Sequence, residues 1–376
     1  MLCGGGAVAA EPAPAYAAQL ATEVSPEPAR AAPPVAEPAP EPRAGSPWPE
    51  LAALVPGVIL HGSGTWLEGR TETSERLLVA EGTGLLATFL SGAVLFRTGA
   101  ARNLVGPTAL LAVAGVGTVG LSLLTSLYAT WAPRSGWGEP APRRALLASS
   151  LGYTYVADPQ FEFHHFLTTH LDLLLGAAPS LHLELATAHA PDQGNQRYEL
   201  LSGLRLFEQR PDAARAPDGS YLEPHIGFSE HRFDRSGFVT RVLELELAGR
   251  LDAARVLPDV RGAFFQLGAG WAEQWFAFDL PGVQALTASS LLLAHLGFGV
   301  YVRRSAEIEL YYDHRHDGFA GGLTALGLGS GVAGHFGLRG QVDISPSWGV
   351  EAQAQVGSAW LLGLAAVLHA GERAQP

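Results

Sequence analysis

The chain has 376 residues, of which 47% are hydrophobic and only 16% charged, and its 45 glycines and 26 prolines argue against a helical bundle. Its 36 acidic residues outnumber the 24 basic ones, which argues against a protein that binds nucleic acid through a basic surface. A single cysteine excludes a disulfide framework and a cysteine-based zinc site. We also expect no cofactor.

Residues 1–10 and 11–49 differ in composition from the rest of the chain. The first ten, MLCGGGAVAA, end in small residues, as a signal peptide does before its cleavage site, but they are too few for a whole one. We interpret them as the remnant of a truncated signal peptide; a short Gly/Ala tail is the alternative. Residues 11–49 contain 11 of the 26 prolines, so we predict a disordered, extended linker in the periplasm.

Residues 50–132 are predicted to form a Gly-rich turn and then a hydrophobic helical hairpin, with Thr73 as the N-cap of the first helix. The stretch 77–96 carries a single charge and 104–131 carries none, and about 20 such residues suffice to span a bilayer. The run GVGTVG at 115–120 matches a dinucleotide-binding pattern, but no alternating strands and helices follow it. We therefore expect these glycines to let two helices pack closely.

Residues 133–376 show a period of two, as in the run LELEL at 243–247. Successive side chains of a strand point to opposite faces, so each such segment has one apolar face and one polar face. About twelve segments show the pattern: 146–156, 164–175, 181–189, 196–207, 222–231, 238–250, 261–276, 288–302, 306–314, 333–344, 348–356 and 360–369. A soluble β-sandwich or soluble barrel would alternate in the same way, but the lengths favour strands that cross a membrane obliquely.

This pattern resembles that of the outer-membrane β-barrel proteins of Gram-negative bacteria, over about residues 145–370, with no specific family identified. The resemblance implies an antiparallel membrane β-barrel in the outer membrane, with outer-membrane lipid and the barrel-assembly machinery as partners and no nucleic acid. One departure is that the last strand, 360–369, lacks the terminal aromatic residue seen in many such proteins.

The polar face of the strands would line the lumen of this barrel. The residues expected there are Glu184, Arg205, Glu244, Glu246, Arg250, Glu307, Glu309, Arg339, Asp343 and Glu351. Because acidic side chains outnumber arginines, a pore would favour cations. A barrel of about twelve strands is narrow enough for side chains to fill it, so structural, adhesion and porin-like roles all remain open at this point.

Two other functions are compatible with the sequence. The segment YYDHRHDG at 311–318 slightly resembles the His-x-Ser motif of outer-membrane lipid A deacylases, which would make the chain a lipid-modifying hydrolase. Its candidate catalytic residues are His314, His316 and Asp317, although His316 stands where the serine nucleophile would be. The other alternative is an inner-membrane protein, anchored by the hairpin, with a periplasmic β-domain. The thirteen histidines form no compact ligand triad, so no metal site is expected.

Overall fold

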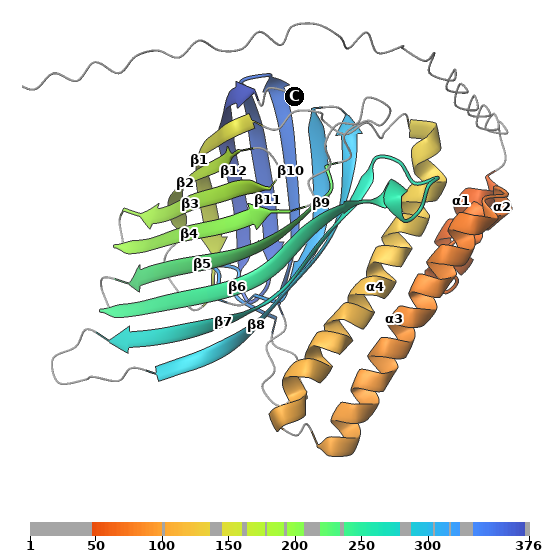
Figure 1. Cartoon of the computed structure of the whole chain (residues 1–376), viewed down its shortest axis with the longest axis horizontal. Coiled ribbons are helices and arrows are strands. Elements are labelled where there is room, and N and C mark those ends of the chain that lie inside the picture. Colours follow the sequence, from red (N-terminus) through yellow and green to blue (C-terminus); the bar gives the residue numbers. More distant parts are fainter. Residues whose placement is uncertain are drawn as a thin grey trace, which may run out of the picture. The chain divides into compact units, whose positions relative to one another are not determined.

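A computed structural model describes residues 47–372, except 100–101, 136–144, 160–163, 177–178, 192–193, 207–218, 234–236, 279–286, 304, 316 and 324–333. The predicted signal remnant and nearly all of the predicted linker lie outside the described residues. Residues Gly45–Pro376 form one compact unit. Helical segments come first in this unit, and strands make up the remainder (Figure 1).

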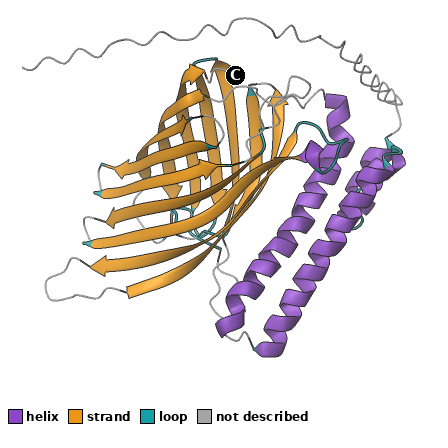
Figure 2. Cartoon of the chain, viewed as in Figure 1, coloured by secondary structure: helices purple, strands orange, loops and turns teal. Residues whose placement is uncertain are grey.

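The helical part contains the predicted hairpin (Figure 2). Its elements are α1 (Trp48–Leu54), η1 (Pro56–Val58), α2 (Ser63–Leu67), α3 (Thr71–Thr98) and α4 (Arg102–Ser135). Two of these, α3 and α4, are long and apolar enough to cross a membrane, the second over Leu104–Ala132. The prediction of two apolar helices ahead of the strands is confirmed.

The first turn of α3 differs from the prediction. The helix begins at Thr71 with Arg70 as its N-cap, and no side chain caps it. Thr73, the predicted N-cap, lies within the helix instead, and its hydroxyl donates a hydrogen bond to Oδ2 of Asp259 at 2.8 Å. A contact with a residue 186 positions away therefore takes the hydroxyl that local capping would have used.

Glycine allows α3 and α4 to cross closely at one point. A Cβ on Gly84 would lie 2.7 Å from the carbonyl oxygen of Gly115, and a Cβ on Gly115 would lie 2.8 Å from that of Gly84. Any larger residue at either position would force the helices apart. Gly82 and Gly120 have open space at the corresponding point, so the expected packing role belongs to the pair Gly84 and Gly115.

Twelve strands form a closed antiparallel barrel, in which each strand pairs with its neighbours in sequence and β1 pairs with β12 (Figures 1 and 2). They are β1 (Ala145–Ala157), β2 (His165–Leu175), β3 (Ser180–Ala190), β4 (Asn195–Arg205), β5 (Tyr221–Phe233), β6 (Phe238–Asp252), β7 (Ala263–Phe278), β8 (Thr287–Arg303), β9 (Ala306–Asp313), β10 (His335–Ser345), β11 (Trp348–Val356) and β12 (Trp360–Glu372), with η2 (Ala253–Arg255) between β6 and β7. The predicted barrel of about twelve strands is confirmed, and closure leaves no strand edge unpaired.

The two faces of the barrel wall differ in polarity. On β6, Leu245 is 62% exposed on the outer face, whereas Glu244 beside it is only 9% exposed. The same division holds on the other strands, with Ile226, Leu338 and Leu364 about half exposed on the outside. A soluble barrel packs its apolar side chains inside and leaves the polar ones in water. This barrel has the reverse arrangement, which is that of a barrel surrounded by lipid.

The hairpin contacts the barrel at β8 and at the link between β6 and β7. Tyr128 of α4 packs edge-on against Phe298 of β8, with ring centroids 6.0 Å apart. Its hydroxyl donates a hydrogen bond to the carbonyl oxygen of Arg261 at 2.7 Å. Leu77 and Val260 are buried in the same apolar cluster. Apolar packing and specific hydrogen bonds thus join α3 and α4 to the barrel wall.

The lumen as the candidate functional site

The ten residues expected in the lumen all lie on the face of the strands opposite the exposed leucines. Nine of them form ion pairs within the barrel: Glu184 with His170, Arg205 with Glu223, Glu244 with Arg315, Glu246 with His225, Arg250 with Glu307, Glu309 with Arg339, and Asp343 with His369. Glu351 lies opposite Gln341 on the neighbouring strand. Because charges of opposite sign from different parts of the barrel pair with one another, the interior holds many charged groups with their charges largely compensated.

Histidines form a second set of lumenal groups, which the sequence did not single out. His182 of β3 lies 2.6 Å from Glu223 and 3.2 Å from Asp172, so one ring joins carboxylates of two other strands. His295 of β8 lies 3.5 Å from Glu309 in a similar pair. These histidines occupy the same alternating strand positions as the lumenal acids. The period of two could therefore have identified them as lumenal residues.

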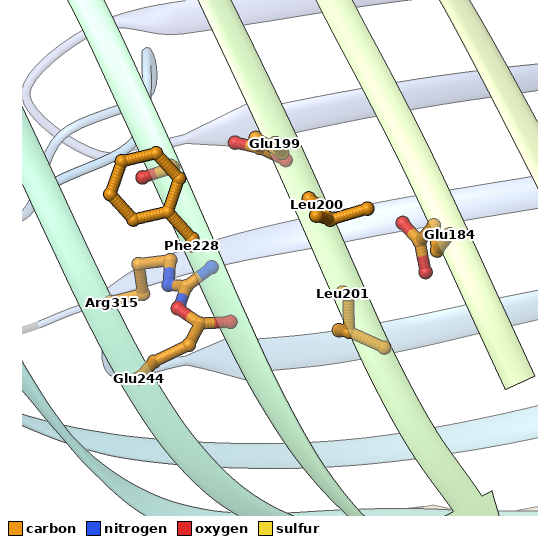
Figure 3. A pocket seen from close by; sticks show the side chains of 8 residues that line it. Glu184, Glu199, Leu200, Leu201, Phe228, Glu244 and Arg315 are labelled. Carbon is orange, nitrogen blue, oxygen red and sulfur yellow. The ribbon is translucent and has the colours of Figure 1, made fainter.

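The segment that follows β9 folds into the barrel. Arg315 forms an ion pair with Glu244 of β6, and Figure 3 shows its guanidinium group beside that carboxylate. Two residues later, the backbone carbonyl of Asp317 accepts a hydrogen bond of 2.7 Å from Arg197 of β4. Because β6 and β4 are not neighbours of β9 in the barrel, these contacts cross the lumen. The chain after β9 thus begins as a segment inside the barrel.

Phe319 anchors the far end of the described part of this segment. Its ring lies 4.4 Å from that of Phe166 on β2 and 5.2 Å from that of His231 on β5, measured between centroids. Phe319 also packs against an apolar cluster that includes Val156 of β1 and Leu361 of β12. We call residues 315 and 317–323 the inner segment. Ion pairs at its start and an aromatic side chain at its end hold it across one mouth of the barrel.

A small cavity lies beside the inner segment (Figure 3). It encloses about 90 Å³, and its lining includes Glu184, Glu199, Glu244 and Arg315. A polar cavity of that size has room for several water molecules. Three carboxylates therefore face one guanidinium group in the hydrated space next to the narrowed part of the lumen.

Two of the three hydrolase candidates, His314 and Asp317, are described, and they have different partners. The ring of His314 lies beside that of Tyr312, whose hydroxyl lies 2.7 Å from its Nδ1. The carboxylate of Asp317 instead lies near two arginines, 3.3 Å from Nε of Arg315 and 3.7 Å from an Nη of Arg197. His316 lies outside the described residues. Within the described part of the chain, no three His, Cys, Asp or Glu side chains are grouped so as to hold a metal ion.

Comparison with known proteins gives matches of fold only. No protein-family model and no curated protein sequence matches the chain. Among solved structures, the KdgM porin bound to disordered oligogalacturonate matches with a TM-score of 0.38 at 7% identity, over 59% of this chain and 98% of that one. The Acinetobacter baumannii outer-membrane protein Omp33 matches with a TM-score of 0.31 at 9% identity, over 60% and 98%.

The Escherichia coli outer-membrane phospholipase A matches with a TM-score of 0.33 at 11% identity, over 62% of this chain and 93% of that one. The barrel is similar to outer-membrane barrels. At these identities the similarity concerns the fold, and it distinguishes neither a porin nor an enzyme.

Proposed function

We propose that this protein is an outer-membrane barrel that conducts small cations through a lumen narrowed by the inner segment. The membrane location is supported by the polarity of the wall, because a closed barrel with apolar side chains outside satisfies every backbone hydrogen bond within lipid. In this setting the surrounding partner is outer-membrane lipid, and the barrel-assembly machinery would insert the chain.

The surplus of acid in the lumen is the observation that carries the proposed selectivity. Among the described residues, the lumenal carboxylates include Asp172, Glu184, Glu199, Glu223, Glu244, Glu246, Glu307, Glu309, Asp313, Asp317, Asp343 and Glu351, whereas the lumenal guanidinium groups are Arg197, Arg205, Arg250, Arg315 and Arg339. Walls of low dielectric strengthen the field of these charges, so cations enter at lower cost than anions.

Arg315 occupies the decisive position in this proposal. Its side chain is 23% exposed and pairs with Glu244 of β6, which lies three strands from β9 around the barrel. A guanidinium group inside the lumen opposes the passage of cations and occupies part of the path. Removing its charge should therefore widen the pore and increase the preference for cations.

The test is single-channel recording of the full chain in planar bilayers under a potassium chloride gradient. The wild-type protein is expected to give channels whose reversal potential indicates cation preference. Arg315→Gln is expected to raise both the conductance and the preference. Arg76→Gln is the matched control, because Arg76 is an exposed arginine of α3 that pairs with Glu72 away from the lumen. Preference for anions, or equal behaviour of the two variants, would contradict the proposal.

A further inference from the structure

An ion cluster lies on the outer face of β5 and β6, where most side chains are apolar. Glu230 accepts a hydrogen bond of 2.6 Å from Nε of Arg232, and another of 2.6 Å from Nε of Arg241 on the neighbouring strand. The two arginine side chains are 51% and 49% exposed, whereas Glu230 is only 14% exposed. One carboxylate thus holds two exposed guanidinium groups side by side, with a net charge of one positive unit.

This ion cluster begins where the apolar belt ends. Arg241 shares its face of β6 with Leu243 and Leu245, and Glu230 shares its face of β5 with Phe228. Arg241 is paired across the strands with Trp275 of β7, an aromatic residue of the kind enriched at membrane interfaces. The ion cluster therefore lies at the depth of the lipid headgroups, on the side of the membrane that contains the β5–β6 connection.

A groove of about 450 Å³ adjoins the ion cluster. Its lining includes Arg232 and Arg241, together with Phe233, Phe238 and Phe278. The aromatic rings are packed together, with centroids 5.4 Å apart for Phe233 and Phe238 and 4.9 Å apart for Phe238 and Phe278. By strand alternation these phenylalanines belong to the lumenal face, whereas the apolar surface beside the arginines on the outer face is formed by Phe228 and Leu243.

We propose that the ion cluster binds an anionic lipid of the surrounding leaflet, with its phosphate on Arg232 and Arg241 and part of an acyl chain against Phe228 and Leu243, which lie beside the cluster on the outer face. Guanidinium groups bind phosphate oxygens through short, charge-assisted hydrogen bonds, and two arginines held together by Glu230 require little further ordering. A soluble anion would use only the arginines, whereas a lipid uses the aromatic surface as well. The site rests on the proposed membrane location, because its arginines point away from the lumen.

Lipid retention by the full chain tests this site. The protein is purified in a neutral detergent, and native mass spectrometry measures the binding of dioleoyl phosphatidic acid, dioleoyl phosphatidylcholine or inorganic phosphate. The wild-type protein should retain phosphatidic acid in preference to phosphatidylcholine. The double variant Arg232→Gln/Arg241→Gln should lose at least about tenfold in apparent affinity, as expected when charge-assisted hydrogen bonds are removed. The control Arg76→Gln should bind like the wild type.

Phe228→Ala separates a lipid site from an anion site, because Phe228 lies on the outer face next to the arginines. It should weaken the binding of phosphatidic acid but leave that of inorganic phosphate unchanged. The proposal is overturned if the double variant retains phosphatidic acid like the wild type, if phosphatidylcholine binds equally well, or if inorganic phosphate displaces the lipid at equal concentration.

Two further measurements separate this site from the proposed channel. Each variant should keep a compact form that migrates differently from the boiled protein on a gel, which shows that the barrel is folded. Cation conductance should be unchanged in the double variant, since its arginines lie outside the lumen. A wild-type protein that binds the lipid but forms no channels would reject the proposed function and leave the lipid site standing.

Discussion

Leu245→Arg is the sharpest test of which face of the barrel contacts lipid. Leu245 is the central residue of β6, is 62% exposed, and lies on the outer wall between Ile226 and Trp271 of the adjacent strands. Arginine at the middle of the lipid-facing wall costs about 2–4 kcal/mol of folding free energy. At about 1.4 kcal/mol for each factor of ten, the folding equilibrium constant should fall by about 30- to 1,000-fold.

Two control variants separate the effect of depth in the membrane from the effect of which face of the barrel wall is changed. Ile344, the last residue but one of β10, is 57% exposed on the same outer wall, so Ile344→Arg near the interface should cost only about 0–1 kcal/mol. Glu244→Gln alters the lumenal neighbour of Leu245 and should cost about 1 kcal/mol, because glutamine still accepts a hydrogen bond from Arg315.

The assay is reversible urea unfolding of the full chain from phospholipid vesicles, followed by tryptophan fluorescence and by migration on gels. The expected order of destabilisation places Leu245→Arg well above the two controls. Equal costs for Leu245→Arg and Ile344→Arg would mean that the outer wall does not face a bilayer. A larger cost for Glu244→Gln than for Leu245→Arg would mean that the two faces have been assigned the wrong way round.

Three further outcomes are expected. The unboiled full chain in detergent should migrate differently from the boiled chain, because a closed barrel has no free edge from which detergent can unravel it; identical migration would reject closure. Gly115→Val should destabilise the hairpin by about 1–3 kcal/mol in urea titrations followed by circular dichroism, whereas Gly120→Val, which has open space at its Cβ, should not. Burial lowers the pKa of His61 from 6.5 despite the opposing effect of Glu81, so the unfolded chain binds more protons just below pH 6.5 and stability should fall as the pH drops through that range. Melting temperatures between pH 5 and 8 should show this loss in the wild type and a smaller one in His61→Gln, and parallel profiles would exclude His61 as its source.

The features that depend on local order were predictable from the sequence. A period of two over segments as long as 238–250 indicates a strand with one apolar and one polar face, whatever surrounds it. Counting such segments was therefore enough to predict about twelve strands. An apolar stretch of about 20 residues with almost no charge, such as 77–96, likewise indicates a helix long enough to cross a membrane.

The ion pairs inside the lumen depend on the register in which neighbouring strands pair. The sequence alone did not determine that register. His182 contacts Glu223 because β3 and β4 pair His182 with Gly203, and β4 and β5 pair Gly203 with His225, two residues beyond Glu223. The same kind of long-range information explains why Thr73 bonds to Asp259 instead of capping α3. Pairs of this kind depend on several strand alignments at once, and no window of sequence contains them.

By itself, the sequence determined that each strand of this protein has two unlike faces, and that a hydrophobic hairpin precedes them. It did not determine which face points inward, because a soluble barrel and a membrane barrel share the same alternation. Only the closed tertiary structure decided this, since closure places Glu244 among partners such as Arg315 and leaves Leu245 on the outside. The path of residues 315 and 317–323 into the lumen was likewise decided by contacts with strands far away in sequence, whose positions exist only once the barrel has closed.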